Sequence, residues 1–126
     1  MKLLKNEVPI IGKTYDALGH CFIVLDVTGN VYYLNKYAIQ LLDFSEEELT
    51  TIQSFSALLK KHHLQDLFDL DNKSVTSEPM RIKNGLKQWK LIEGTLDESS
   101  VLFLFDKDVT AQEEVFEVLT YSGPQK

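Results

Sequence analysis

Apolar and charged side chains alternate over residues 80–83, which predicts a strand with one buried face and one face in water. Asn84 and Gly85 follow as a hairpin turn, because both residue types tolerate a positive φ. A second strand is expected over residues 88–96, and a third over residues 101–105 after a short turn. The third strand is apolar at every position, as a strand buried on both faces is.

The first third of the chain predicts another hairpin. Residues 21–25 and 31–34 are apolar and rich in β-branched or aromatic side chains, and the Asp-Val-Thr-Gly-Asn stretch between them supplies turn residues. Before this hairpin, Pro9 and Gly12 argue against one long helix. Residues 1–19 are therefore expected to be a lead-in with a short flanking helix.

Helical signals fill the middle of the chain. Asn35 follows a predicted strand, and its side-chain oxygen can accept a first-turn amide, so a helix is expected after it. Ser45 and Glu48 have the spacing of a capping box, which predicts that a short helix begins there. Residues 54–70 carry apolar side chains near helical spacing with charges between them, which predicts an amphipathic helix.

The predicted order is two strands, several short helices and three strands, which defines an α+β fold. We expect one antiparallel sheet of five strands, with short helices covering one face. The 126 residues suit a single domain with its own core. The formal net charge of −6 disfavours a phosphate backbone as a partner, so no nucleic-acid binding is expected.

The N-terminal residues lack the apolar run and cleavage site of a signal peptide. The longest apolar run, residues 101–105, is far shorter than a membrane span. Cys21 is the only cysteine, which fits a reducing compartment. We therefore expect a cytoplasmic domain without direct membrane contact.

Three stretches, in this order, resemble the PAS family of sensory domains. Residues 29–49 (GNVYYLNKYAIQLLDFSEEEL) are similar to the family's pattern of a glycine, a short strand, an asparagine, a leucine-rich helix and a Glu-Glu-Leu end. Residues 83–89 (KNGLKQW) resemble its hairpin ending in tryptophan, and residues 106–110 (DKDVT) its Asp-Ile-Thr element that closes the last strand. Asp43 stands where the family usually has glycine, and Lys36 where it often has proline.

The resemblance implies a sensor or signal-relay module of a bacterial-type signal-transduction protein. The implied effector is a histidine kinase or a cyclic-dinucleotide enzyme in the same chain. Residues 20–110 would form the PAS domain, and residues 111–126 would begin an exit helix that carries the signal. Asp106, Asp108 and Thr110 would couple the sheet to this helix. The plain alternative for Asp108 and Thr110 is a cap and a turn.

Many members of the family dimerise through helices that flank the sheet, so a homodimer is implied. The alternative function is a ligand-free interaction module that acts through dimerisation. Its contact would use the exposed faces of the last strands and the apolar stripe of Val115, Phe116, Val118 and Leu119.

A small-molecule ligand is implied to lie between the sheet and the central helices, in a mostly apolar pocket. The bulky side chains expected there favour a small or closed cavity. The candidate lining residues are Tyr33, Phe55, Leu59, His63, Leu67, Met80, Trp89, Leu91 and Phe103.

No cofactor and no metal site are expected. Flavin-binding members use a cysteine within an Asn-Cys-Arg-Phe string, which this chain lacks, so Cys21 is better interpreted as a small buried hydrophobe. His62 and His63 are the haem-ligand candidates, but the interpretation that both lie on a polar helix end is favoured. His20 is interpreted as structural.

No enzyme signature is present. The chain contains no G-x-x-x-x-G-K-[ST], G-x-G-x-x-G, H-E-x-x-H or G-x-S-x-G motif. Glu46, Glu47 and Glu48 are adjacent, and their attraction to a helix start explains them. We therefore expect no catalytic residues in this segment.

Overall fold

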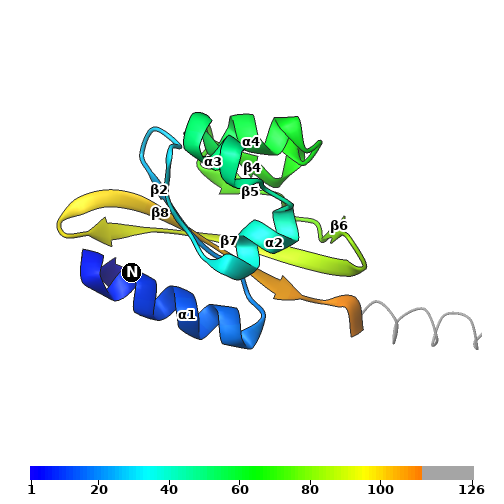
Figure 1. Ribbon diagram of the computed structural model, residues 1–126, viewed down its shortest axis with the longest axis horizontal. Coiled ribbons are helices and arrows are strands. Elements are labelled where there is room, and N and C mark those ends of the chain that lie inside the picture. The colour runs from blue at the N-terminus through cyan, green and yellow to red at the C-terminus, as the bar shows by residue number, and fades with distance from the viewer. Residues whose placement is uncertain (112–126) are drawn as a thin grey trace, which may run out of the picture.

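The computed structural model describes residues 1–111, which form a six-stranded sheet with helices on both faces and a separate two-stranded sheet (Figure 1). The strand order is β1-β7-β8-β2-β3, with β6 also paired to β7, and every pair except β1–β7 is antiparallel. The predicted α+β fold with five antiparallel strands is confirmed, and β1 is an additional parallel edge strand that the pattern did not predict. The strands are β1 (Lys2–Leu3), β2 (Phe22–Asp26), β3 (Val31–Leu34), β6 (Met80–Ile82), β7 (Gly85–Leu96) and β8 (Ser99–Asp108).

The expected exit helix falls almost wholly outside the described residues. Of residues 111–126, only Ala111 is described. The apolar stripe of Val115, Phe116, Val118 and Leu119 also lies outside them.

Helix α1 (Val8–Leu18) covers the face of the sheet opposite to the short helices, for which no cover was predicted (Figure 1). Helix α1 is longer than the short flanking helix that was expected, and it includes both Pro9 and Gly12. Pro9 lies in the first turn, where its missing amide has no helical partner to lose. Gly12 lies where a side chain would collide with the Tyr33 hydroxyl, so it permits close packing of the helix on β3. A 3₁₀ turn, η1 (Lys5–Glu7), leads into the helix.

The opposite face carries the layer of short helices expected from the sequence. They are α2 (Lys36–Leu42), α3 (Glu46–Thr51) and α4 (Phe55–Lys61). Asn35 caps α2 by accepting the Ala38 amide, as predicted. Asp43 ends α2 with a φ of 65°, the left-handed conformation that explains why glycine is common at such a position.

The predicted helix over residues 54–70 is too long. Helix α4 ends at Lys61, and His63 then takes a φ of 58°, which a right-handed helix does not allow. The chain continues as a 3₁₀ turn, η2 (Gln65–Leu67), and as β4 (Phe68–Asp69), which pairs with β5 (Ser74–Val75).

The hairpin between β6 and β7 differs from the predicted one by one residue. Ile82 pairs with Gly85, so the two central turn residues are Lys83 and Asn84. Lys83 takes the positive φ, at 54°. The strained position therefore falls on a lysine, one residue before the expected Asn-Gly pair.

Glu48 joins α3 to α4 from a buried position. Its carboxylate accepts the Ser45 amide at 2.7 Å, which completes the predicted capping box. The same carboxylate contacts His62 Nε2 at 2.8 Å and Lys61 Nζ at 3.1 Å. Burial alone raises the pKa of Glu48, but these hydrogen bonds outweigh it and lower the pKa to about 2.

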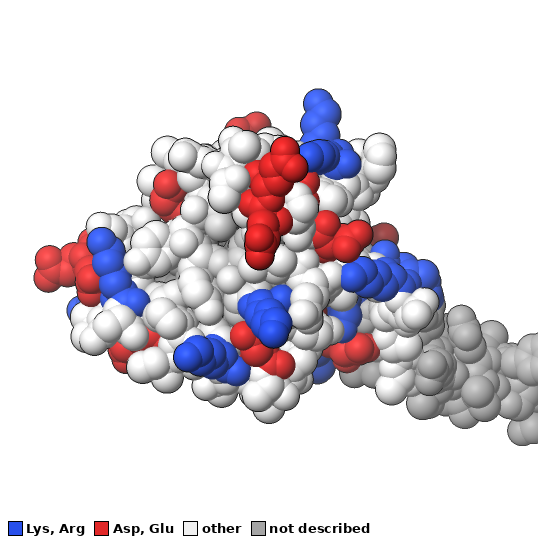
Figure 2. All heavy atoms as spheres, viewed as in Figure 1, with Lys and Arg blue, Asp and Glu red and all other residues white. Residues whose placement is uncertain are grey.

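None of the helices within residues 1–111 combines the length and apolar character that a bilayer span requires. On the face shown in Figure 2, basic and acidic side chains are interspersed over the described residues.

Replacing Glu48 by Gln should lower the free energy of unfolding by about 2 kcal/mol at neutral pH, because a buried paired charge is lost. The ordinary pKa of this group is 4.5 and its folded value is about 2. Its contribution is therefore complete above pH 4.5 and is lost as the pH falls towards 2. Chemical denaturation of both proteins from pH 7 to pH 2 measures this difference.

The exposed Glu47, in the first turn of the same helix, provides the matched control as Glu47→Gln. This change should alter stability by less than about 0.5 kcal/mol. An equal loss in the two variants would show that the Glu48 contacts contribute nothing specific.

Candidate functional site

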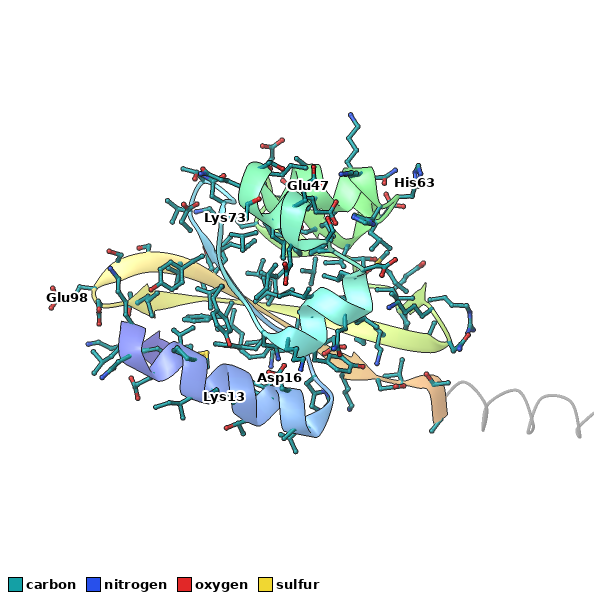
Figure 3. The ribbon with its side chains drawn as sticks, viewed as in Figure 1. Lys13, Asp16, Glu47, His63, Lys73 and Glu98 are labelled. Atoms are coloured by element: carbon teal, nitrogen blue, oxygen red, sulfur yellow. The ribbon has the colours of Figure 1, made fainter. Side chains whose placement is uncertain are left out.

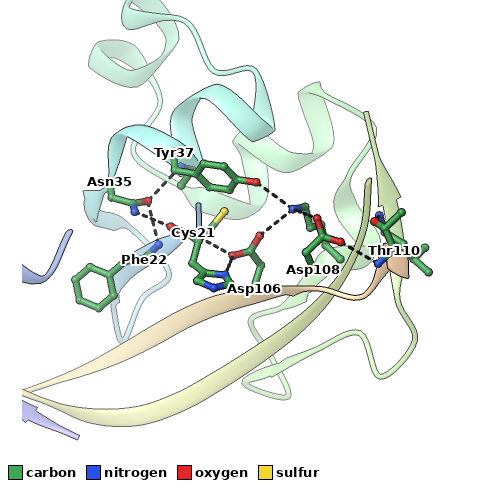
Figure 4. A network of polar contacts seen from close by, with 11 residues as sticks. Cys21, Phe22, Asn35, Tyr37, Asp106, Asp108 and Thr110 are labelled. Carbon is green, nitrogen blue, oxygen red and sulfur yellow. Dashed lines mark hydrogen bonds and ion pairs between the residues drawn. The ribbon is translucent and has the colours of Figure 1, made fainter. Parts of the chain in front are cut away.

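A buried polar network lies where α1 ends, β2 begins and the chain leaves β8 (Figure 4). Its central group is the Lys87 ammonium. On β7, residues 87, 89 and 91 point to the helical layer, so strand alternation directs Lys87 inward beside Trp89 and Leu91. Only 4% of the Lys87 side chain is exposed.

The Lys87 ammonium donates to the Tyr37 hydroxyl at 3.0 Å and to Asp108 Oδ2 at 3.2 Å. It also lies 3.9 Å from Asp106 Oδ2. Burial alone lowers the pKa of this lysine, but the contacts with Tyr37 and Asp108 outweigh it and raise the pKa. The network therefore holds a full positive charge inside the domain.

Asp106 carries the matching buried negative charge. Its side chain has no exposed surface, and its Oδ1 accepts the Cys21 amide at 2.5 Å. Burial, and then the Asp106 charge, raise the pKa of the Cys21 thiol. The thiol stays neutral, which agrees with its interpretation as a small hydrophobe.

Asn35 ties three elements together. Its Oδ1 accepts the Phe22 amide at 3.0 Å and the Ala38 amide at 3.1 Å, and its Nδ2 donates to the His20 carbonyl at 2.8 Å. Tyr37, in the first turn of α2, donates its amide to Asp16 Oδ1 at 2.7 Å. The start of β2, the start of α2 and the end of α1 are therefore held in one arrangement.

The predicted relay residues connect the network to the chain beyond the sheet. Asp108 Oδ1 accepts the Thr110 amide at 2.8 Å, and Thr110 Oγ1 accepts the Leu86 amide at 2.8 Å. Val109 also donates to the Leu86 carbonyl at 2.9 Å. The hydrogen bonds with Thr110, and then Lys87, lower the pKa of Asp108 to about 2. Asp108 and Thr110 thus act as a turn and also bind the adjacent strand.

Together these contacts form a continuous path from α1 to the point where the chain leaves the sheet. It runs from Asp16 through Tyr37, Lys87 and Asp108 to Thr110. We call the turn that follows Asp108 and includes Thr110 the exit turn. Helix α1 and the exit turn are more than 80 residues apart in sequence, and the path connects both to the Lys87 ammonium.

The predicted pocket residues do not line one common space. Tyr33 and Phe103 belong to the cluster under α1, on the opposite face of the sheet. His63 is exposed and lies at the end of the helical layer (Figure 3). The other six belong to the core cluster between the sheet and the short helices: Phe55, Leu59, Leu67, Met80, Trp89 and Leu91.

That inner core is densely filled. Phe55, Leu59 and Leu67 have no exposed surface, and Trp89 is 3% exposed. Three surface hollows stand out on the described residues, and none is lined by these four side chains. The expectation of a small or closed cavity describes this core better than an open pocket does.

The residues present do not fit a haem. His62 Nε2 is engaged by Glu48, and its ring packs against Phe44 at a centroid distance of 5.2 Å. His63, the other candidate, is exposed. Within residues 1–111, no group of three or more His, Cys, Asp or Glu side chains is arranged to hold a metal ion.

The predicted site residues did not include four members of the network: Asp16, His20, Tyr37 and Lys87. A signal for Lys87 was present, because it shares its strand parity with Trp89 and Leu91 and must therefore point inward. Asp16 gave no such signal, because its partner lies on an element 21 residues away.

The strand order and the layer of short helices over one face define a small α+β module. No family model and no curated protein matches the chain. Among solved structures, the chain is similar to the PAS domain of a protein from Desulfitobacterium hafniense. The two are 16% identical with a TM-score of 0.46, and the match covers 76% of this chain and 98% of that one.

Replacing Lys87 by Met should lower the free energy of unfolding by about 3 kcal/mol, because the buried Asp106 carboxylate loses its nearest cation. Adding Asp106→Asn removes the uncompensated charge while keeping an acceptor for the Cys21 amide. The double variant should therefore be more stable than Lys87→Met alone. Denaturant titration measures the three values.

Lys60→Met, at an exposed position on α4, is the matched control and should change stability by less than about 0.5 kcal/mol. If Lys87→Met cost no more than this control, the ion pairs around Lys87 would not contribute to stability.

Proposed function

We propose that this chain is a sensory and signal-relay module that couples helix α1 to the chain leaving the sheet after Thr110. The continuous path of contacts through Lys87 is the observation that carries the proposal. A rearrangement at either end has to displace a buried charge or break a buried hydrogen bond. Such steps are costly, so the two ends are expected to change state together.

The ammonium has two carboxylates within reach. Lys87 Nζ lies 3.2 Å from Asp108 and 3.9 Å from Asp106. Asp108 is the last residue of β8 and accepts the Thr110 amide of the exit turn, whereas Asp106 holds the residue before β2 through the Cys21 amide. A small shift of Lys87 between them would redistribute charge between the sheet and the exit turn.

The parent protein that we propose is a bacterial-type signal-transduction protein in the cytoplasm, with a histidine kinase or a cyclic-dinucleotide enzyme as its effector. The segment itself is proposed to be non-catalytic. Its one thiol is buried with a raised pKa, so it is unsuited to act as a nucleophile. The Glu48 carboxylate is committed to structural contacts.

A double-mutant cycle tests the relay. Asp16→Ala removes the acceptor at the α1 end, and Thr110→Val removes the hydroxyl at the exit turn. Their effects on the free energy of unfolding should be non-additive by at least about 0.5 kcal/mol, although the residues share no contact. In the Lys87→Met background the coupling energy should fall below about 0.3 kcal/mol.

Thr14→Ala combined with Thr110→Val is the control cycle, because among residues 1–111 the Thr14 hydroxyl bonds only to Ile10 within the same helix. This pair should be additive. Additivity of the Asp16 and Thr110 changes, or a coupling unaffected by Lys87→Met, would contradict a relay through Lys87.

A second candidate function is a ligand-free module that acts by forming a homodimer. It is favoured by the outward face of α1, where Ile10 is 67% exposed and Leu18 is 63% exposed. Light scattering on the full chain should then give twice the chain mass at micromolar concentration. Ile10→Glu with Leu18→Glu should give the monomer mass.

Tyr32→Glu, at a 47% exposed site on β3, is the control and should leave the dimer intact. A monomer mass for the unmodified chain at high micromolar concentration would exclude this candidate.

A further inference from the structure

A hollow of about 720 Å³ lies on the α1 face of the sheet, next to the polar network. Tyr15, Ile92 and Phe105 line its apolar part, and Lys90 and Lys107 line its charged part. The volume is within the range of small-molecule sites. From this combination we infer that the hollow binds a small monocarboxylate with an apolar body, of the fatty-acid kind.

The apolar surface is built by two strands and one helix. Phe105 on β8 packs on Tyr15 of α1 with ring centroids 5.6 Å apart, and Ile92 on β7 belongs to the same partly buried cluster. Helix α1 covers the sheet through Val8 and Ile11 nearer its start. The hollow therefore has a rigid hydrophobic floor that would bury an alkyl or aryl chain.

The two lysines lie on the same face as this floor. Lys90 is directly opposite Phe105 in the ladder, and Lys107 lies two residues after Phe105 on β8, so both side chains project on the α1 side. Both are exposed, and within residues 1–111 neither has an ion-pair partner. Two unpaired cations beside an apolar surface complement one carboxylate with an apolar body.

The inner edge of the hollow does not compete for these cations. Asp106 and Asp108 also line the hollow, but both carboxylates pair with Lys87. Their alternation on β8 places them on the helical side of the sheet, opposite to Phe105. A bound carboxylate would therefore meet Lys90 and Lys107 and not a free acidic group.

The site adjoins the proposed relay at His20, Asp106 and Asp108, which belong both to the lining and to the polar network. A ligand bound in the hollow would shift the positions of these three residues. That consequence rests on the proposed function, whereas binding itself does not.

Calorimetric titration of the full chain with decanoate tests the site. Saturable binding is expected, with amide shifts in the ¹⁵N–¹H spectrum centred on Tyr15, Ile92 and Phe105. Decanol, which lacks the charge, should bind at least about tenfold more weakly, and Lys90→Gln with Lys107→Gln should weaken decanoate binding about tenfold.

Lys13→Gln with Lys60→Gln is the matched control, because both lysines are exposed away from the hollow, and it should leave the affinity unchanged (Lys13, Figure 3). Equal affinities for decanoate and decanol, or no effect of the Lys90 and Lys107 changes, would overturn the assignment of a carboxylate. Absence of saturable binding would overturn the site.

Other occupants of the hollow give distinct results. Shifts at residues 90–92 that depend on protein concentration, without decanoate binding, would assign the hollow to a second copy and overturn the inference. Failure to bind decanoate at every protein concentration would overturn it equally. Decanoate binding that leaves the Asp16–Thr110 coupling unchanged would contradict the relay but not the site.

Discussion

The buried ammonium of Lys87 is the constraint on which the arrangement of this domain depends. A charge that is 4% exposed must be compensated, and its partners come from two elements: Tyr37 from α2, and Asp106 and Asp108 from the end of β8, where the chain leaves the sheet. The compensation therefore fixes the relative positions of the sheet, the helical layer and the departing chain. Apolar packing supplies most of the stability, but it is less specific about these positions.

The two faces of the sheet have different roles as a result. The face under α2, α3 and α4 is filled by aliphatic and aromatic side chains and holds the network at its edge. The face under α1 is only partly covered, and an apolar hollow remains beside the end of that helix. An input on the open face would lie close to the charges that set the exit turn, without opening the packed core. This is an alternative to ligand entry between the sheet and the helices.

Much of the fold could be predicted from the sequence, because local signals agreed with the final structure. Strand alternation at residues 80–83, the cap at Asn35 and the capping box of Ser45 and Glu48 are all present as expected. The errors arose where tertiary contacts override local preference. Gly12 lowers helix propensity, yet it lies in α1, at a position where Tyr33 leaves no room for a side chain.

The candidate site was only partly predictable from the sequence. Asp106, Asp108 and Thr110 were predicted and are in the network. Whether the predicted aromatic residues line one pocket depends on which face of the sheet each of them points to. Tyr33 and Phe103 proved to lie on the other face.

Native-state hydrogen exchange under graded denaturant tests the central claim most directly, because it reports the opening free energy of each amide in the network. Four amides report on the network. Those of Cys21, Tyr37 and Leu86 donate to the side chains of Asp106, Asp16 and Thr110, respectively. The Val109 amide donates to the Leu86 carbonyl on the adjacent strand. If the network is one unit, these four amides open with the same free energy and the same denaturant dependence. If Leu86 and Val109 instead exchange through a separate opening of lower free energy, while Cys21 and Tyr37 stay protected, the exit turn is not coupled to α1 and the account is contradicted.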